Sequence, residues 1–214
     1  MVKRVVFIRS GETDWNRQER WQGWAASPLN AHGLQQAEAL GRFVRHIGLS
    51  TLYTSDLRRA LQTADALAVY LTFEPIPDVR LRERAVGLWQ GLTFDEMQAW
   101  YPEEFAELLA DREHFTLPGG ESRAEVRNRM QEAFDDFIAR DAGETIGILS
   151  HTAAIKFLLD ELIPSSVSED YNLGNTSVTT IRRSEGGWEL VASDDQAHLD
   201  GLASSAVTEP EERR

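Results

Sequence analysis

Residues 2–10 read VKRVVFIRS, and this stretch decides the fold class. Its β-branched and aromatic side chains predict a buried strand over residues 2–8. A second run of this kind, TIGIL, occupies residues 145–149. Such short runs alternate along the chain with longer helical patterns, which is typical of an α/β domain with a largely parallel sheet. We therefore predict an α/β layered domain around residues 2–8.

Helical patterns fill the segments between the predicted strands. Asn30 can cap a helix that Gly48 ends. After a short strand at residues 52–54, Ser55 or Asp56 can cap the next helix. The first of these helices has an inward apolar stripe made of Leu34, Ala37, Leu40, Val44 and Ile47.

The second half of the chain continues the same alternation. An amphipathic helix is predicted over residues 122–140, before the strand at 145–149, and His151 opens another helix. Residues 177–182 and 188–192 are joined by a Glu-Gly-Gly turn. They predict a β-hairpin that forms an antiparallel edge of the sheet.

The composition excludes several classes of protein. The chain of 214 residues carries 22 Lys plus Arg against 35 Asp plus Glu, a formal net charge of −13, and no cysteine. Without cysteine there is no disulfide framework, no Cys-ligated metal cluster and no thiolate nucleophile. Nucleic acid and anionic membranes are bound through a basic face, so we expect neither as a partner.

Length and hydropathy favour one compact domain. With 42% apolar residues the chain can bury a substantial core. We assign residues 1–203 to that domain and the small, polar residues 204–214 to a loose C-terminal tail. No stretch approaches the roughly 18 apolar residues of a membrane span, and the apolar run at residues 5–8 is much shorter than a signal-peptide core. We therefore expect a cytoplasmic protein.

Basic residues follow several of the predicted strands. Arg9 follows the first strand, Arg59 lies shortly after the second, and His151 follows the strand at residues 145–149. Ligands of such sheets bind beyond the carboxyl ends of the strands, so we expect these side chains to converge. Arginine offers forked donors that suit phosphate, and helix N-termini near Ser55 and His151 would add backbone donors. The sequence therefore predicts a site for a small phosphorylated metabolite.

Each of these residues also has a purely structural interpretation. Arg9 would then form a strand-end ion pair, Arg59 would be an ordinary helix cation, and His151 a helix cap or a core histidine. Their shared position at the strand ends favours a binding site. The other histidines lack this context, and we expect a structural role for His32, His46, His114 and His198.

Six sequence blocks follow one another along the chain. They are Arg9-Ser10-Gly11-Glu12-Thr13-Asp14-Trp15-Asn16, Ser55-Asp56-Leu57-Arg58-Arg59-Ala60, Leu81-Arg82-Glu83, Pro118-Gly119-Gly120-Glu121-Ser122, Ser150-His151 and Asn175-Thr176-Ser177. In this order the blocks resemble the histidine phosphatase superfamily in its phosphoglycerate mutase-like branch. One block alone is weak, but together they are specific. The resemblance reaches to about position 200 and implies a three-layer α/β/α sandwich with a mostly parallel central sheet.

The resemblance also implies a two-step phosphoryl transfer and a set of site residues. In the family, a histidine directly after the first arginine attacks phosphorus and becomes a phosphohistidine. Carried to this sequence, Arg9 and Arg59 are the phosphate clamps, His151 is the second histidine that holds the phosphate, and Glu83 is the proton donor. Clamping cations stabilise the charge of the transition state. The resemblance adds further binding positions at Asn16, Gln22, Gly23, Ser55 and Arg84.

The resemblance also bears on cofactors and assembly. Family catalysis needs no metal, and the sequence shows no constellation of metal ligands, so we expect no metal and no cofactor. Dimers are common among such proteins, which makes a homodimer one option.

The sequence departs from the family at the nucleophile, where Ser10 stands in place of histidine. A serine hydroxyl is a poor nucleophile without an adjacent base or metal. If His151 were that base, it would lose its role as an oxygen clamp. In other covalent enzymes, loss of the nucleophile costs on the order of 10⁴ to 10⁶ in rate. We predict that phosphate binding survives and that turnover is very weak or absent.

Three functions remain open on the sequence. Mutases carry a longer insertion with Lys and Arg after the general-acid block, whereas residues 91–118 contain Arg112 as their one Lys or Arg. Arg84 matches the mutase pattern, but Ala85 and Val86 replace the aromatic residue and the histidine that follow it there. We favour a phosphatase over a mutase. If Ser10 is natural, an inactive phospho-ligand binding or regulatory module is the third option.

The segments expected to select the substrate are residues 15–26 and 92–118. Both read as apolar and acidic rather than strongly cationic. They therefore favour a modestly charged or partly apolar phosphomonoester.

Overall fold

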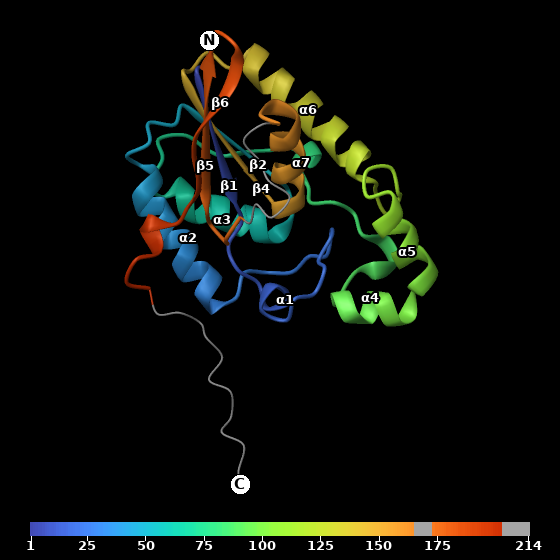
Figure 1. The fold of residues 1–214 in the computed structure, drawn as a ribbon. Helices are drawn as coiled ribbons and strands as arrows, with labels where there is room; N and C mark the ends of the chain where they lie inside the picture. Colours follow the sequence, from blue (N-terminus) through green and yellow to red (C-terminus); the bar gives the residue numbers. More distant parts are fainter. Residues whose placement is uncertain (165–172, 203–214) are drawn as a thin grey trace.

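A six-stranded sheet forms the centre of the protein (Figure 1). The structure, a computed structural model, describes residues 1–164 and 173–202. The spatial order of the strands is β3-β2-β4-β1-β5-β6. Strands β3, β2, β4 and β1 pair in parallel, β5 is antiparallel to β1, and β6 is antiparallel to β5. This confirms the mostly parallel sheet with a hairpin at one edge. The strands are β1 (Arg4–Arg9), β2 (Thr51–Thr54), β3 (Ile76–Pro77), β4 (Thr145–Ser150), β5 (Val178–Ser184) and β6 (Gly187–Asp195).

Side chains of β1 alternate between the two faces of the sheet. Val5 and Phe7 belong to the core under α6 and α7, whereas Val6 and Ile8 belong to the core under α2 and α3. All four are buried, because a central strand is covered on both faces. The result is the predicted three-layer α/β/α sandwich (Figure 1). The covering helices are α2 (Ala31–Val44), α3 (Arg58–Ala68), α6 (Arg123–Arg140) and α7 (Thr152–Leu162).

Side-chain caps start α2 and α6 at the predicted positions. The side chain of Asn30 accepts a hydrogen bond from the Gly33 N–H at 2.8 Å, and Ser122 forms a reciprocal capping box at α6. The predicted stripe of α2 is wrong at Leu34, which is 49% exposed. Ile47 packs against the core as predicted, but the helix ends at Val44, before both Ile47 and Gly48.

Helix α3 begins later than the sequence pattern predicts. Its N-cap is Leu57, so neither Ser55 nor Asp56 is the cap. Both polar side chains are engaged elsewhere. The Ser55 hydroxyl lies 2.8 Å from the imidazole of His151, and the Asp56 carboxylate pairs with Arg82 at 2.5 Å. The first of these contacts belongs to the site described below.

A smaller helical lobe lies beside the sandwich, and the sequence patterns do not predict it. It contains α4 (Phe94–Trp100) and α5 (Pro102–Ala110), each too short for a clear helical period. Its core surrounds Trp89, which is fully buried against Met97 and Phe105. The lobe follows two 3₁₀ turns, η1 (Val79–Leu81) and η2 (Gly87–Trp89).

Two short elements complete the description. Helix α1 (Asp14–Arg17) follows β1, and the 3₁₀ turn η3 (Ala197–Leu199) follows β6. The predicted tail at residues 204–214 lies outside the described residues, and the assignment of residues 1–203 to one domain stays a prediction. Among the helices of residues 1–164 and 173–202, none has the length and apolar character needed to cross a membrane.

Candidate active site

The carboxyl ends of β1, β2 and β4 meet at one edge of the sheet. Arg9 and Ser150 are register partners at the ends of β1 and β4, so Ser10 and His151 follow on adjacent strands. A cavity of about 700 Å³ lies at this edge. Most residues that the predicted function places in contact with substrate line it, namely Arg9, Ser10, Asn16, Gln22, Gly23, Arg59, Glu83, Arg84 and His151. Ser55, the other predicted binding position, is not among the lining residues.

Arg59 is a buried guanidinium held by backbone carbonyls. It is 3% exposed and donates to the carbonyls of Gly23 at 3.0 Å and Ala25 at 3.3 Å, while its Nε donates to Nδ1 of His151 at 3.2 Å. Burial lowers the pKa of Arg59 to about 10, against the opposing charge of Glu83. Binding of an anion restores the interactions that such a desolvated cation has lost.

Arg9 is the second cation at this inner end of the cavity. Its guanidinium donates to the carbonyl of Leu173, and burial lowers its pKa although the carboxylates of Glu83, Asp194 and Glu12 oppose the shift. In the part of the chain that the structure describes, neither Arg9 nor Arg59 donates a hydrogen bond to a carboxylate. The pair therefore offers positive charge to an incoming oxyanion.

His151 is a neutral hydrogen-bond donor in this arrangement. Its Nδ1 accepts from Arg59, so the proton is assigned to Nε2, which donates to the Ser55 hydroxyl at 2.8 Å. Burial, followed by the charge of Arg59, holds the pKa of His151 well below its usual value. Both ring nitrogens are thus engaged, and neither acts as a base toward Ser10.

Ser10 is fixed through its backbone alone. It is 4% exposed, its N–H donates to the Ser150 carbonyl at 3.0 Å, and its own carbonyl accepts from Asn175 Nδ2 at 3.2 Å and the Thr176 N–H at 3.3 Å. Within residues 1–164 and 173–202 its hydroxyl has no hydrogen-bond partner. The position is well defined, but nothing described there activates the oxygen.

The Glu83 carboxylate lies at the start of α7. It accepts hydrogen bonds from the N–H groups of Ala153 and Ala154, each at 3.1 Å, and from the Arg84 N–H at 2.8 Å. The expectation that this helix N-terminus donates to phosphate is therefore wrong for these two N–H groups, because Glu83 already occupies them. The proton-donor role of Glu83 stays a prediction.

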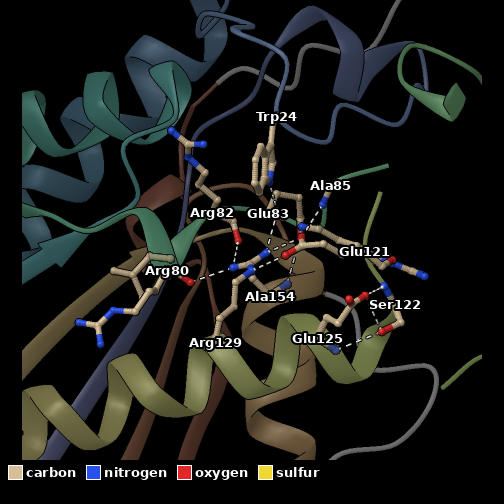
Figure 2. Close-up of polar contacts among 12 residues, drawn as sticks. Trp24, Arg80, Arg82, Glu83, Ala85, Glu121, Ser122, Glu125, Arg129 and Ala154 are labelled. Atoms are coloured by element: carbon tan, nitrogen blue, oxygen red, sulfur yellow. Dashed lines mark hydrogen bonds and ion pairs between the residues drawn. The ribbon is translucent and has the colours of Figure 1, made fainter. Parts of the chain in front are cut away.

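Arg129, on α6, holds the backbone that carries Glu83. Figure 2 shows its guanidinium between Glu121 and residues 80–83. All five of its N–H donors are used: three reach backbone carbonyls of residues 80–83 at 2.6 to 2.9 Å, and two reach the Glu121 carboxylate at 2.8 and 2.9 Å. The Glu83 carbonyl also accepts from Trp24 Nε1 at 2.7 Å. Glu83 is therefore fixed from two sides.

Neither the role of Arg129 nor that of Glu121 is predicted from the sequence. A signal was available, because Arg129 lies three residues after Val126 and next to Met130, on the buried side of α6. A charged residue inside an apolar stripe needs buried partners. Here those partners are the carbonyls beside the site.

Three other predicted residues shape the cavity wall. Asn16 forms a capping box with Thr13 at α1, and the amide oxygen of Gln22 has no hydrogen-bond partner among the described residues. Gly23 has a φ of +49°, and a Cβ there would lie 2.7 Å from Cγ2 of Val86. Only glycine fits this turn without strain, and the turn presents the Gly23 carbonyl to Arg59.

The cavity wall contains more cations than the sequence predicts. Besides Arg9 and Arg59, it is lined by Arg20, Arg84, Arg112, Arg123 and Lys156, and we call these five residues the outer part of the cavity. The expectation of apolar and acidic surroundings is therefore wrong. Two of these cations, Arg123 and Lys156, come from α6 and α7, outside the two segments from which that expectation was made.

Residues 5–196 match the histidine phosphatase superfamily, branch 1. The chain belongs to this family. The site geometry agrees with the resemblance seen in the sequence, since the six quoted blocks lie within or beside the matched residues and four of them contribute cavity-lining side chains. Among the described residues, no group of three or more His, Cys, Asp or Glu is placed to hold a metal ion.

Named relatives include both mutases and phosphatases. A Yersinia pestis protein named "probable phosphoglycerate mutase GpmB" is 31% identical over 204 residues, which cover 92% of this chain and 95% of that protein. A mutant phosphoserine phosphatase from Entamoeba histolytica, solved in complex with phosphoserine, is 27% identical with a TM-score of 0.82, covering 92% and 98%. Mycobacterial glucosyl-3-phosphoglycerate phosphatase, solved with VO3, is 28% identical with a TM-score of 0.78, covering 89% and 98%.

Proposed function

We propose that this family member is a phosphatase-type protein that binds small phosphomonoesters and hydrolyses them very weakly or not at all. The observation that carries the proposal is the pair of desolvated guanidiniums, Arg9 and Arg59, beside the neutral imidazole of His151. The two guanidiniums suit the oxygens of a phosphoryl group, whose charge they stabilise. The Nε2–H of His151 becomes a third donor if it exchanges the Ser55 hydroxyl for a phosphoryl oxygen. A cavity of about 700 Å³ leaves room for the alcohol part of the ester.

The weak turnover follows from the surroundings of Ser10. Its hydroxyl needs a base to attack phosphorus, and the neighbouring imidazole of His151 is engaged at both nitrogens. A histidine at this position would supply an imidazole nitrogen that attacks without prior loss of a proton. The absence of that nucleophile removes on the order of 10⁴ to 10⁶ in rate.

Two other functions each have one observation in their favour. A mutase is favoured by the name of the Yersinia relative, together with Arg84 in the cavity wall. A phospho-ligand binding or regulatory module is favoured by the Ser10 hydroxyl, which has no partner in the described part of the chain. The mutant phosphoserine phosphatase from Entamoeba histolytica, in complex with phosphoserine, illustrates that a mutant protein of this family can hold a phosphorylated ligand.

One set of variants tests the proposal. The unaltered chain, Ser10→His and Ser10→Ala are assayed for phosphate release from p-nitrophenyl phosphate and from 3-phosphoglycerate. Binding of inorganic phosphate is measured by calorimetry. We expect all three proteins to bind phosphate, Ser10→His to gain about 10⁴-fold or more in hydrolysis, and Ser10→Ala to remain as slow as the unaltered chain.

The outcomes separate the three functions. A folded Ser10→His protein without hydrolysis or mutase activity contradicts the enzyme proposal, and phosphate binding in that case supports the module. Conversion of 3-phosphoglycerate to its isomer, rather than release of phosphate, supports the mutase. If the unaltered chain turns over as fast as Ser10→His, the account of the missing nucleophile is wrong.

A further inference from the structure

The turn before β5, residues 173–177, holds the two residues at the end of β1. The Arg9 guanidinium donates to the Leu173 carbonyl, and the Arg9 N–H donates to the Ser177 carbonyl at 3.1 Å. The carbonyl of Ser10 accepts two further hydrogen bonds from the same turn. The inner end of the cavity therefore depends on the conformation of residues 173–177.

Thr176 has an unusual backbone conformation at the centre of this turn. Its φ is +59°, in the left-handed region that β-branched residues rarely adopt, and its side chain is fully buried. Such a strained conformation persists only when the surrounding structure fixes it. In this conformation the Thr176 N–H donates to the Ser10 carbonyl at 3.3 Å. The contacts that fix Thr176 therefore also fix Ser10.

The hydroxyl of Thr176 is held by His198. It donates to the Asn175 carbonyl at 2.6 Å, so it accepts from Nε2 of His198 at 3.0 Å. The His198 ring lies in η3 and packs against Phe43 of α2, with 5.6 Å between the ring centres. Its Nδ1 is buried and has no hydrogen-bond partner within the described residues. Burial also lowers the pKa of His198, against the opposing charge of Asp195, which favours the neutral ring.

A second contact from the same C-terminal segment fastens the turn. The Asp194 carboxylate accepts from the Gly174 N–H at 2.6 Å and from Gln196 Nε2 at 3.1 Å. The segment is itself supported by α2, beside which it lies (Figure 1). Residues 194–198 thus hold the turn at two points, Gly174 and Thr176.

His198 does not line the cavity, so any effect on bound phosphate must pass through Thr176. We propose that His198 is a positioning residue, which through Thr176 fixes the backbone of Ser10 and so the distance from the side chain at position 10 to the phosphate. The inference rests on the proposed function, because the inner end is taken to hold that phosphate. A displacement of about 1 Å between reacting groups can cost about 10²-fold in rate.

Amide hydrogen exchange in the unaltered chain tests the contact without requiring any activity. His198→Phe keeps an aromatic ring at this position but removes the Nε2–H donor. We expect exchange of the Thr176 and Arg9 amides, followed by NMR under native conditions, to become about tenfold faster or more. The Ser55 amide, which donates to the Leu149 carbonyl at 2.9 Å, should stay within about twofold and serves as the internal control.

Matched variants assign the effect to one hydrogen bond. His198→Gln should restore slow exchange, because its amide Nε2 can donate to the Thr176 hydroxyl. Thr176→Val removes the same bond from the other side, so His198→Phe/Thr176→Val should exchange at Arg9 no faster than the faster single variant. The control is His46→Phe, since His46 lines the same surface hollow but accepts from Arg45. This control should leave the exchange of the Arg9 amide unchanged.

Kinetics in the Ser10→His background tests the consequence for phosphoryl transfer. There His198→Phe should lower kcat by about tenfold or more and change KM by less than about threefold, because Arg59 is held by a different loop. The kcat is expressed per phosphate-binding site, counted by calorimetry, so that unfolded protein does not contribute. His198→Gln should restore most of the kcat.

The failures of the two proposals are distinguishable. If His198→Phe leaves exchange at Thr176 and Arg9 unchanged, or leaves kcat per site unchanged, His198 is not a positioning residue, while the proposed function stands. If phosphate does not bind, or if the folded Ser10→His protein is inactive, the proposed function is wrong. The exchange measurements then still decide whether His198 fixes the turn.

Discussion

The inner and outer ends of the cavity are both cationic, but they are built differently. At the inner end Arg59 and His151 are almost fully buried, hydrogen-bonded to each other and to fixed backbone. At the outer end Arg112 is exposed and Arg123 shares its charge with Asp160. Buried, preorganised donors act strongly and with fixed geometry, whereas exposed charges are screened by salt. We therefore expect the inner end to determine which chemical group is bound, and the outer end to modulate affinity among the molecules that carry this group.

The largest expected difference concerns the two acidic residues of the cavity. In the Ser10→His background, Glu83→Gln should slow hydrolysis of alkyl phosphates by about 10²- to 10⁴-fold and of p-nitrophenyl phosphate much less, because only the alkyl leaving group needs a proton. Asp160→Asn, at the outer end, should change both rates by less than about tenfold. Steady-state kinetics on both esters measures this. Equal slowing of the two esters by Glu83→Gln would remove Glu83 from the role of acid.

The next effect concerns neighbouring arginines on α3. Arg59→Ala should weaken binding of inorganic phosphate by about 100-fold or more, because it removes a buried charged donor. Arg58→Ala is the matched control, since Arg58 is adjacent and exposed, and it should change the affinity by less than about threefold. Calorimetry reports both. Unchanged phosphate affinity in a folded Arg59→Ala protein would contradict the clamp.

A smaller effect separates two arginines of α6 by stability. Arg129→Lys keeps the charge but cannot supply five donors in the fork, so buried carbonyls lose their partners. We expect the free energy of unfolding to fall by about 2 kcal/mol. Arg127→Lys, whose partners are carboxylates at the surface, should cost less than about 1 kcal/mol. Denaturant unfolding measures both, and equal losses would mean that Arg129 is not a special support of the inner wall.

The smallest expected effect is a pH dependence at the inner end. The pKa of His151 in the folded protein lies well below its usual value, so below a pH of about 6.5 the unfolded chain takes up a proton that the folded one does not. The stability contributed by neutral His151 is therefore present above that pH and declines as the pH falls, by at most about 1.4 kcal/mol per pH unit.

His151→Gln tests this, because it removes the titrating group and should flatten the decline relative to the unaltered chain between about pH 6.5 and 5. His198→Gln is the comparison, since burial also lowers the pKa of His198, away from the cavity. Both variants are followed by denaturant unfolding at each pH. An identical pH profile in His151→Gln and the unaltered chain would show that His151 is not held neutral.

Much of the inner end was predictable because it depends on residues close to strand ends. Arg9, Ser10 and His151 follow strands with strong β-branched patterns, and the sheet topology then forces them together. The start of α3 was not predictable in the same way, because Ser55 is an excellent cap by type but contacts His151 instead. The Ser55 hydroxyl can either cap α3 or contact His151. Which of the two occurs depends on tertiary packing, which the local sequence does not contain.

The outer end escaped prediction for a different reason. Arg123 and Lys156 lie on two different helices, and Arg20, Arg84 and Arg112 lie in three separate loops, so no window of sequence contains the cluster. Arg123 reads as an ordinary helix cation at the surface, and Lys156 as a solvated residue on an apolar helix. The short helices α4 and α5, which precede Arg112 in the chain, have too few turns to show a period.

The central position of β1 has a consequence for how the protein is made. β1 is completed at Arg9, but its neighbours β4 and β5 begin only at residues 145 and 178, and the hydrogen bonds from Asn175 and Thr176 hold the carbonyl of Ser10. During synthesis β1 therefore stays unpaired, with its apolar side chains uncovered, until β4 and β5 have been produced. Such long-range pairing slows folding and exposes the strand to aggregation. We therefore expect the edge of the sheet that carries Ser10 and His151 to be among the last parts of the molecule to form.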